Sequence, residues 1–227
     1  MTESSFHPTH WTLVLSARGK SAEAKAALSD LCATYYVPVV SFLHREGRNE
    51  DAAREMAHAF FESLLAGGLG MPDPERGRFR SYLLGALKHF LVKQRGGLLA
   101  AKRGGGAEHV PLEAEEALPP MADDSLAFDR EWALTLIARA LAALESEYSG
   151  KPRVFAVLKP WLDGAAEGPQ AEAAVELGIS EGAVKVAIHR LRARFRELIR
   201  AEVATTVNDP AEVGEELRHL IAVASRG

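Results

Sequence analysis

Apolar residues recur at spacings of three and four along most of the chain, which is the pattern of amphipathic α-helices. No run of alternating apolar and polar residues indicates a strand, and no internal repeat of fixed period is present. The predicted fold class is therefore all-α. The pattern predicts helices over residues 21–46, 51–65, 79–98, 129–144, 154–162, 171–177, 181–200 and 209–225.

The stretch from Ala171 to Arg200 predicts two helices joined by a three-residue turn. Gly178 is placed to end the first helix in the left-handed conformation, and Ser180 to cap the second. Ile179, between them, is expected to fill the angle between the helices. A helix of this kind, held on a scaffold helix, is the right size for the major groove of DNA. On the second helix a cationic stripe lies beside the apolar one: Lys185, His189, Arg192 and Arg196.

The predicted helix 51–65 has two unlike faces. Opposite its apolar stripe lies a polar one: Asp51, Glu55, His58 and Glu62. This polar face is either simply solvated or a docking face for a partner. A metal site is a third interpretation, because Glu55 with His58 and Glu216 with His219 form the Glu-x-x-His pairs of di-iron bundles. However, Glu55 and His58 point away from the apolar stripe, whereas such ligands project into a bundle core.

A loop rich in glycine and proline, residues 66–78, precedes the predicted helix 79–98. Aromatic and cationic residues are interleaved on this helix, which suits single-stranded nucleic acid, whose bases can stack on aromatic rings. The aromatic residues alone are equally typical of a core. The cationic side chains expected on the outside are Arg78, Arg80, Lys88, His89, Lys93 and Arg95.

The formal net charge is −4, but the distribution of charge along the chain says more about partners than this total does. Residues 76–103 hold eight Lys or Arg and no acid, and residues 108–131 hold eight acids and one Arg. Residues 185–200 are basic again, with six Lys or Arg against one acid. This segregation predicts two electropositive surfaces separated by an acidic connector. Two DNA contacts on one molecule are the simplest interpretation.

These patterns predict four parts. Residues 1–98 and 129–200 form two helical domains, residues 99–128 form a flexible acidic linker, and residues 201–227 form a C-terminal extension. The motif Asp-Pro-Ala-Glu at 209–212 predicts a capped helix in that extension. This C-terminal helix has three candidate roles: it packs on the second domain, it dimerises, or it binds a regulator.

The sequence contains no apolar run long enough to span a membrane and no signal-peptide pattern. A single cysteine, Cys32, excludes an internal disulfide and is expected to be a core residue. We therefore expect a cytoplasmic protein without membrane insertion.

Together these features resemble the extracytoplasmic-function (ECF) class of bacterial sigma factors, the small two-domain initiation subunits of RNA polymerase. The resemblance covers roughly residues 21–200. NEDAAREMAHAFFESLL at 49–65 is similar to the polymerase-docking motif of that class. GRFRSYLLGALKHFLVKQR at 77–95 is similar to the region that melts and reads the −10 element, and ISEGAVKVAIHRLRARFREL at 179–198 to the helix that reads the −35 element.

The resemblance implies a specificity factor that is not an enzyme and has no cofactor. Its partners would be core RNA polymerase and promoter DNA, with an anti-sigma protein or a kinase as a regulator. The loop 67–79 would hold a flipped base, and Lys185, His189 and Arg190 match positions that touch −35 DNA. The positions implied at or near the polymerase-docking surface are Asp51, Glu55, His58, Phe60, Phe61 and Glu62.

The chain departs from the family at several positions. The family usually has Gln at His58, Trp at Tyr82, Asn at His89 and Asp at Lys93. Polar residues usually stand at Val186 and Ala187, so this chain either recognises a different promoter or relies more on DNA shape and phosphate contacts.

Three other functions remain open at this stage. The main alternative is a stand-alone helix-turn-helix repressor or activator that dimerises through the C-terminal helix and binds a palindromic duplex. The other two are a di-metal carboxylate enzyme and a structural adapter.

Overall fold

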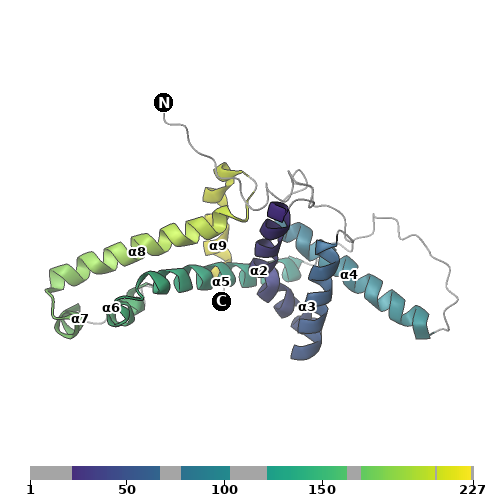
Figure 1. Ribbon diagram of the computed structural model, residues 1–227, viewed down its shortest axis with the longest axis horizontal. Helices are drawn as coiled ribbons and strands as arrows, with labels where there is room; N and C mark the ends of the chain where they lie inside the picture. Colours follow the sequence, from purple (N-terminus) through teal and green to yellow (C-terminus); the bar gives the residue numbers. More distant parts are fainter. Residues whose placement is uncertain (1–21, 67–77, 103–121, 163–169, 208, 226–227) are drawn as a thin grey trace. The chain divides into compact units, whose positions relative to one another are not determined.

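The computed structural model describes residues 22–66, 78–102, 122–162, 170–207 and 209–225. Within these ranges every regular element is helical (Figure 1), which confirms the predicted all-α class. The described residues form two compact units. Unit 1 comprises those up to Thr135 together with those from Thr205 onward, and unit 2 comprises Leu136–Ala204. None of the described helices is long and apolar enough to cross a membrane.

Three consecutive helices begin unit 1: α2 (Ala22–Arg45), α3 (Glu50–Leu65) and α4 (Phe79–Lys102). The Asn49 side chain caps α3 by accepting a hydrogen bond from the backbone N–H of Ala52 at 2.9 Å. Aromatic rings join the helices in the core, where Phe60 meets Phe90 edge-on with ring centroids 5.6 Å apart. Cys32 is buried as expected, and its burial raises the pKa of the thiol to about 12.

Unit 1 is completed by the first half of α5 (Ala122–Glu147), by the 3-10 turn η3 (Pro210–Glu212) and by α9 (Val213–Ala224). Asp209 caps η3 as its sequence predicts, accepting a hydrogen bond from the backbone N–H of Ala211 at 2.8 Å. The apolar side of α9 is buried, and so is Trp132 of α5.

This division differs from the predicted domains. Both ends of the predicted linker 99–128 are helical, because α4 continues to Lys102 and α5 begins at Ala122. Residues 103–121 lie outside the described residues. Phe128 and Trp132 are fully buried in unit 1, so the start of α5 belongs to that unit and not to a separate connector. The C-terminal helix also belongs to unit 1, so it does not pack as part of unit 2.

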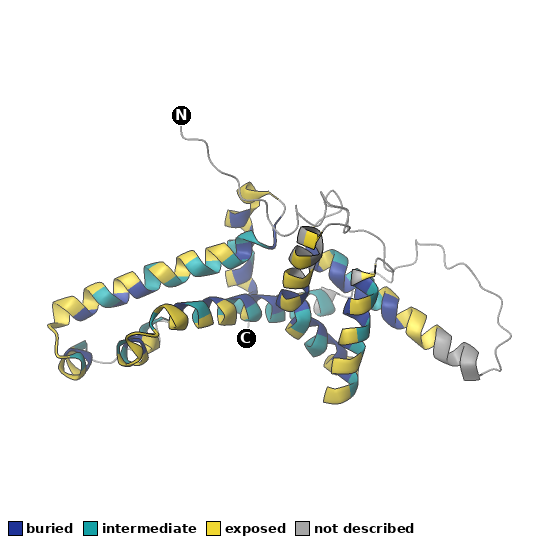
Figure 2. Cartoon of the chain, viewed as in Figure 1, coloured by how far each residue is buried: buried dark blue, intermediate teal, exposed yellow. Residues whose placement is uncertain are grey.

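Unit 2 contains the second half of α5 with α6 (Pro152–Leu158), η2 (Lys159–Trp161), α7 (Gln170–Leu177) and α8 (Glu181–Ala204). The predicted helix 154–162 therefore ends early, and Pro160 stands in the 3-10 turn that follows it. Figure 2 shows buried and exposed residues alternating along α8, as in an amphipathic helix. Every helix of the unit contributes to one core: Leu144, Phe155, Leu158, Ala173, Ala174, Val184, Ile188 and Leu191.

Candidate nucleic-acid interface

The turn between α7 and α8 has the geometry that its sequence predicts. Gly178 has a φ of 66°, in the left-handed region that glycine reaches without strain. Its N–H donates to the Val175 carbonyl at 3.3 Å, and the N–H of Ile179 donates to the Ala174 carbonyl at 3.0 Å. These two bonds form a Schellman motif, which satisfies carbonyls at the end of α7. The Ser180 hydroxyl then caps α8.

Ile179 does not fill the angle between the two helices, and the prediction that it does is wrong. Its side chain is 41% exposed. The inner side of α7 is occupied instead by Ala173 and Ala174, with Leu177 packed against the same core. Small alanine side chains let α7 approach the core closely, so the turn needs no larger apolar residue there.

Replacing Gly178 with alanine should lower the free energy of unfolding by about 1 kcal/mol or more, because a Cβ disfavours the left-handed conformation. Gly182 provides the matched control. It lies in the first turn of α8, where an added Cβ would meet only the Ser180 hydroxyl, at 3.9 Å. Urea denaturation should therefore show a loss for Gly178→Ala and none for Gly182→Ala. Equal midpoints for the two variants would contradict the assigned turn.

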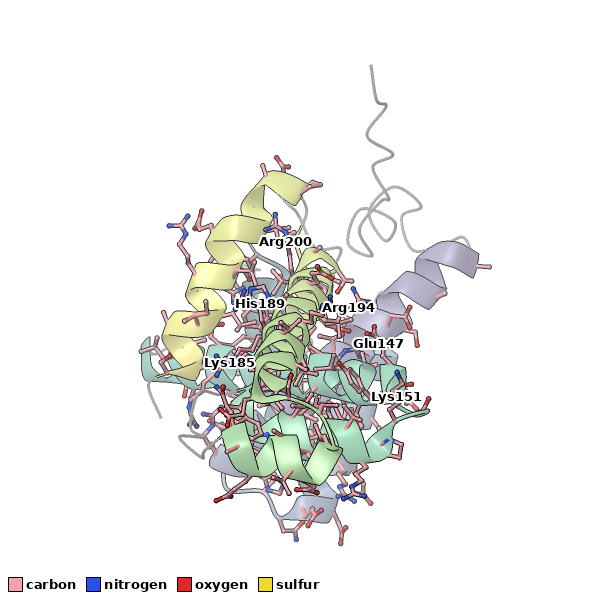
Figure 3. All side chains as sticks on the ribbon, turned by 90° about the vertical axis from the view of Figure 1, so that its left-hand side faces the viewer. Glu147, Lys151, Lys185, His189, Arg194 and Arg200 are labelled. Atoms are coloured by element: carbon pink, nitrogen blue, oxygen red, sulfur yellow. The ribbon has the colours of Figure 1, made fainter. Side chains whose placement is uncertain are left out.

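The outward side of α8 carries cations that have no partner in the described part of the chain. Lys185, His189 and Arg190 are exposed, and neither an ion pair nor a hydrogen bond to described residues engages them. Arg196, one turn and a half further on, is exposed in the same way. Figure 3 shows Lys185 and His189 on one side of α8. These side chains are free to meet an anionic partner.

Two other arginines of α8 are held by the chain itself. Arg192 is half-buried, and its Nε donates to the Trp161 carbonyl at 2.6 Å. Arg192 therefore keeps its predicted place beside the apolar stripe, but its Nε is engaged by the chain itself. Arg194 extends from the opposite side (Figure 3) and makes bonds of 2.7–3.1 Å to both carboxylate oxygens of Glu147. Those bonds hold the pKa of Glu147 below its usual range.

In unit 1 only some of the predicted cations are available. His89 and Lys93 of α4 are exposed and have no partner among the described residues. Arg95 is exposed but pairs with Glu46 at 3.0 Å. Lys88 is half-buried, pairs with Asp124 at 2.7 Å and lies 5.9 Å from the centre of the Phe42 ring. Lys88 was predicted to lie on the outside, but its side chain is largely covered and paired.

Arg80 is not on the surface, and the prediction that it is available to DNA is wrong. Its side chain is 4% exposed, and its Nε donates to Asp129 of α5 at 2.8 Å. It also pairs with Glu216 of α9, whose side chain is 3% exposed. The guanidinium lies 4.6 Å from the centre of the Trp132 ring. Burial lowers the pKa of Arg80, and the neighbouring Asp129 opposes that shift.

Other charged residues extend the ion pairs of Arg80 on both sides. Arg78 reaches Glu216 at 3.1 Å and Glu215 at 2.7 Å, and its own side chain is partly exposed. His219 of α9 contacts the second carboxylate oxygen of Asp129 at 2.7 Å. We call Arg78, Arg80, Asp129, Glu216 and His219 the buried ionic cluster. It joins the start of α4 to α5 and α9. Glu216 and His219, one of the two predicted metal pairs, are engaged there by the two arginines and by Asp129 respectively.

The acidic face of α3 is partly as predicted. Asp51, Glu55 and Glu62 are exposed, whereas Phe60 and Phe61 are buried. The two phenylalanines therefore lie beneath the implied docking surface and not on it, because both fall on the inner side of α3. His58 is exposed and engaged by a residue that the sequence did not single out, Tyr36 of α2.

Tyr36 joins α2 to the acidic face of α3. Its hydroxyl lies 3.1 Å from Nε2 of His58, and the two rings stack with centroids 5.4 Å apart. The Tyr36 ring also stacks with that of Phe61, with centroids 6.2 Å apart. The helical pattern of residues 21–46 gave no signal that Tyr36 makes this contact.

No protein-family model, no curated protein and no solved structure matches this chain.

Proposed function

We propose that this chain is a sigma factor of the ECF class, a cytoplasmic subunit that directs core RNA polymerase to particular promoters. One observation carries the proposal: Lys185, His189 and Arg190 of α8 have no partner in the described part of the chain, while Arg192 and Arg194 are engaged by the chain's own oxygens. Unpaired cations at the start of a helix that follows a tight turn support insertion into the major groove as a helix-turn-helix.

A second DNA contact is proposed on α4. His89 and Lys93 are exposed there and free to meet the phosphates of a promoter strand. Arg80 is excluded from this role by its burial, and it acts instead as a structural residue of unit 1. Two modest contacts on one chain reinforce each other through effective concentration.

Docking to the polymerase is assigned to the exposed side of α3. Asp51, Glu55 and Glu62 present exposed carboxylates on the helix face that also carries His58, whose ring stacks with that of Tyr36. Carboxylates on the same face as an accessible pair of stacked rings support an interface with a basic, partly apolar partner surface. In the proposal that partner is the core enzyme.

Neutralising this face should weaken association with core RNA polymerase. We expect the double variant Asp51→Asn, Glu55→Gln to bind about tenfold less tightly, because two charges that steer and orient the contact are lost without a change in volume. Glu46→Gln is the control, since it removes a carboxylate in the turn after α2 that pairs with Arg95. Affinities can be measured by surface binding of purified core enzyme. Equal affinities of the unmodified chain, the double variant and Glu46→Gln for core enzyme would exclude this docking face.

The second candidate is a stand-alone helix-turn-helix regulator, which the cations of α8 would serve equally well. Its dimerisation through α9 has less support, because Val213, Leu220 and Val223 of that helix are buried in unit 1. A gel shift with and without core polymerase separates the two functions. A sigma factor should retard specific duplex DNA only together with the enzyme, and a stand-alone regulator should do so alone with nanomolar affinity.

A further inference from the structure

The centre of the outward face of α8 is apolar. At about 100° per residue, Val186 lies nearly opposite the buried line of Val184, Ile188 and Leu191. Its side chain is 50% exposed. By the same arithmetic Lys185 and His189 lie on one side of Val186 and Arg190 on the other. The face therefore consists of an alkyl group between two cationic edges.

This arrangement matches the chemistry of the major groove. A helix in that groove turns its flanks toward the phosphates of the two strands and its centre toward the base edges. Val186 can neither donate nor accept a hydrogen bond, so it cannot pair with the donors and acceptors of adenine, guanine or cytosine. The C5-methyl group of thymine is the apolar group that the groove presents.

We propose that Val186 is a specificity-determining residue that contacts the C5-methyl group of a thymine in the duplex bound by α8. The inference rests on the proposed function, since it requires that α8 bind duplex DNA. The cations on either side supply affinity for phosphate without regard to sequence, and Val186 selects a thymine at the base pair that it faces. Gly182, one turn earlier on the same face, has no side chain that would hold the helix away from the bases.

Deoxyuridine tests this contact directly, because it pairs as thymidine does and lacks only the methyl group. A promoter is first obtained by transcribing random genomic fragments with core RNA polymerase and the full chain. Each thymine of its upstream duplex is then replaced in turn by deoxyuridine, and binding of the holoenzyme is measured. At one position the replacement should lower the affinity of the holoenzyme about fourfold. This factor corresponds to the free energy of burying one methyl group away from water.

Two variants show whether Val186 is responsible. With Val186→Ala the sensitivity to deoxyuridine at that position should fall below about 1.5-fold, because the alkyl partner of the methyl group has been removed. Val175→Ala is the matched control, since Val175 is 84% exposed on α7 and away from the outward face of α8. Val175→Ala should still lose about fourfold in affinity when deoxyuridine replaces the sensitive thymine.

The outcomes separate the inference from the proposed function. A promoter whose binding is indifferent to every replacement, or whose sensitive position persists in Val186→Ala, overturns the inference and leaves the sigma-factor function standing. If no promoter is obtained with core enzyme, the proposed function fails and the inference fails with it. A single sensitive thymine that becomes insensitive only in Val186→Ala supports both.

Discussion

Replacing Arg80 with methionine is expected to lower the free energy of unfolding by about 3 to 5 kcal/mol, the usual cost of removing one partner from a buried ion pair. Arg80 is the shared partner of two carboxylates, and one of them, Glu216, is almost fully buried. Without the guanidinium, Glu216 keeps only the partly exposed Arg78. The contact with the Trp132 ring is lost as well.

Urea denaturation followed by circular dichroism measures this effect, and hydrogen exchange of the α9 amides localises it. Arg95→Met is the matched control on the same helix. Its exposed pair with Glu46 should contribute less than about 1 kcal/mol. The double variant Arg80→Met, Glu216→Leu should lose less than Arg80→Met alone, because no buried carboxylate of α9 remains unpaired. Equal losses for Arg80→Met and Arg95→Met would show that the buried ionic cluster does not hold unit 1 together.

The second large effect is a loss of promoter-specific transcription when the exposed cations of α8 are removed. Lys185→Ala and Arg190→Ala should each reduce promoter-specific transcription about tenfold, since a cationic contact to a base or phosphate contributes about 1 to 3 kcal/mol. Both side chains are exposed and without partners among the described residues, so neither change should unfold the protein.

Arg194→Ala is the control, because it removes the same charge from α8 at a position where the side chain already pairs within the chain. Its guanidinium is already neutralised by Glu147 and Glu197, so transcription should change less than twofold. The assay is run-off transcription with core enzyme, with circular dichroism as a check on folding. Unchanged transcription in both Lys185→Ala and Arg190→Ala, or an equal loss in Arg194→Ala, would contradict the assignment of the outward face.

Features set by neighbouring residues could be predicted from the sequence. The left-handed Gly178, the Ser180 and Asp209 caps and the periodicity of the helices depend on interactions within a few residues. The exposed positions of Lys185 and His189 follow from the same helical period. These local rules were enough to define the all-α class and the candidate face of α8.

Features set by distant partners could not be predicted. Arg80 is followed by apolar residues in a basic segment, and its two carboxylates come from α5 and α9, far along the chain. The acids up to Asp124 indicated a flexible linker, because no local pattern shows that Asp124 meets Lys88. Asp129 begins the next predicted helix, and nothing in its neighbourhood shows that it meets Arg80. Burial of a charge depends on such tertiary partners, and helical periodicity carries no information about them.

The central claim is that this chain gives core RNA polymerase its choice of start sites. The most direct measurement maps the 5′ ends of transcripts made from genomic DNA by core enzyme alone and by core enzyme with the purified chain. The account predicts a set of discrete start sites that appears only when the chain is present and is lost in the Lys185→Ala, Arg190→Ala double variant. The same ends with and without the chain would contradict it.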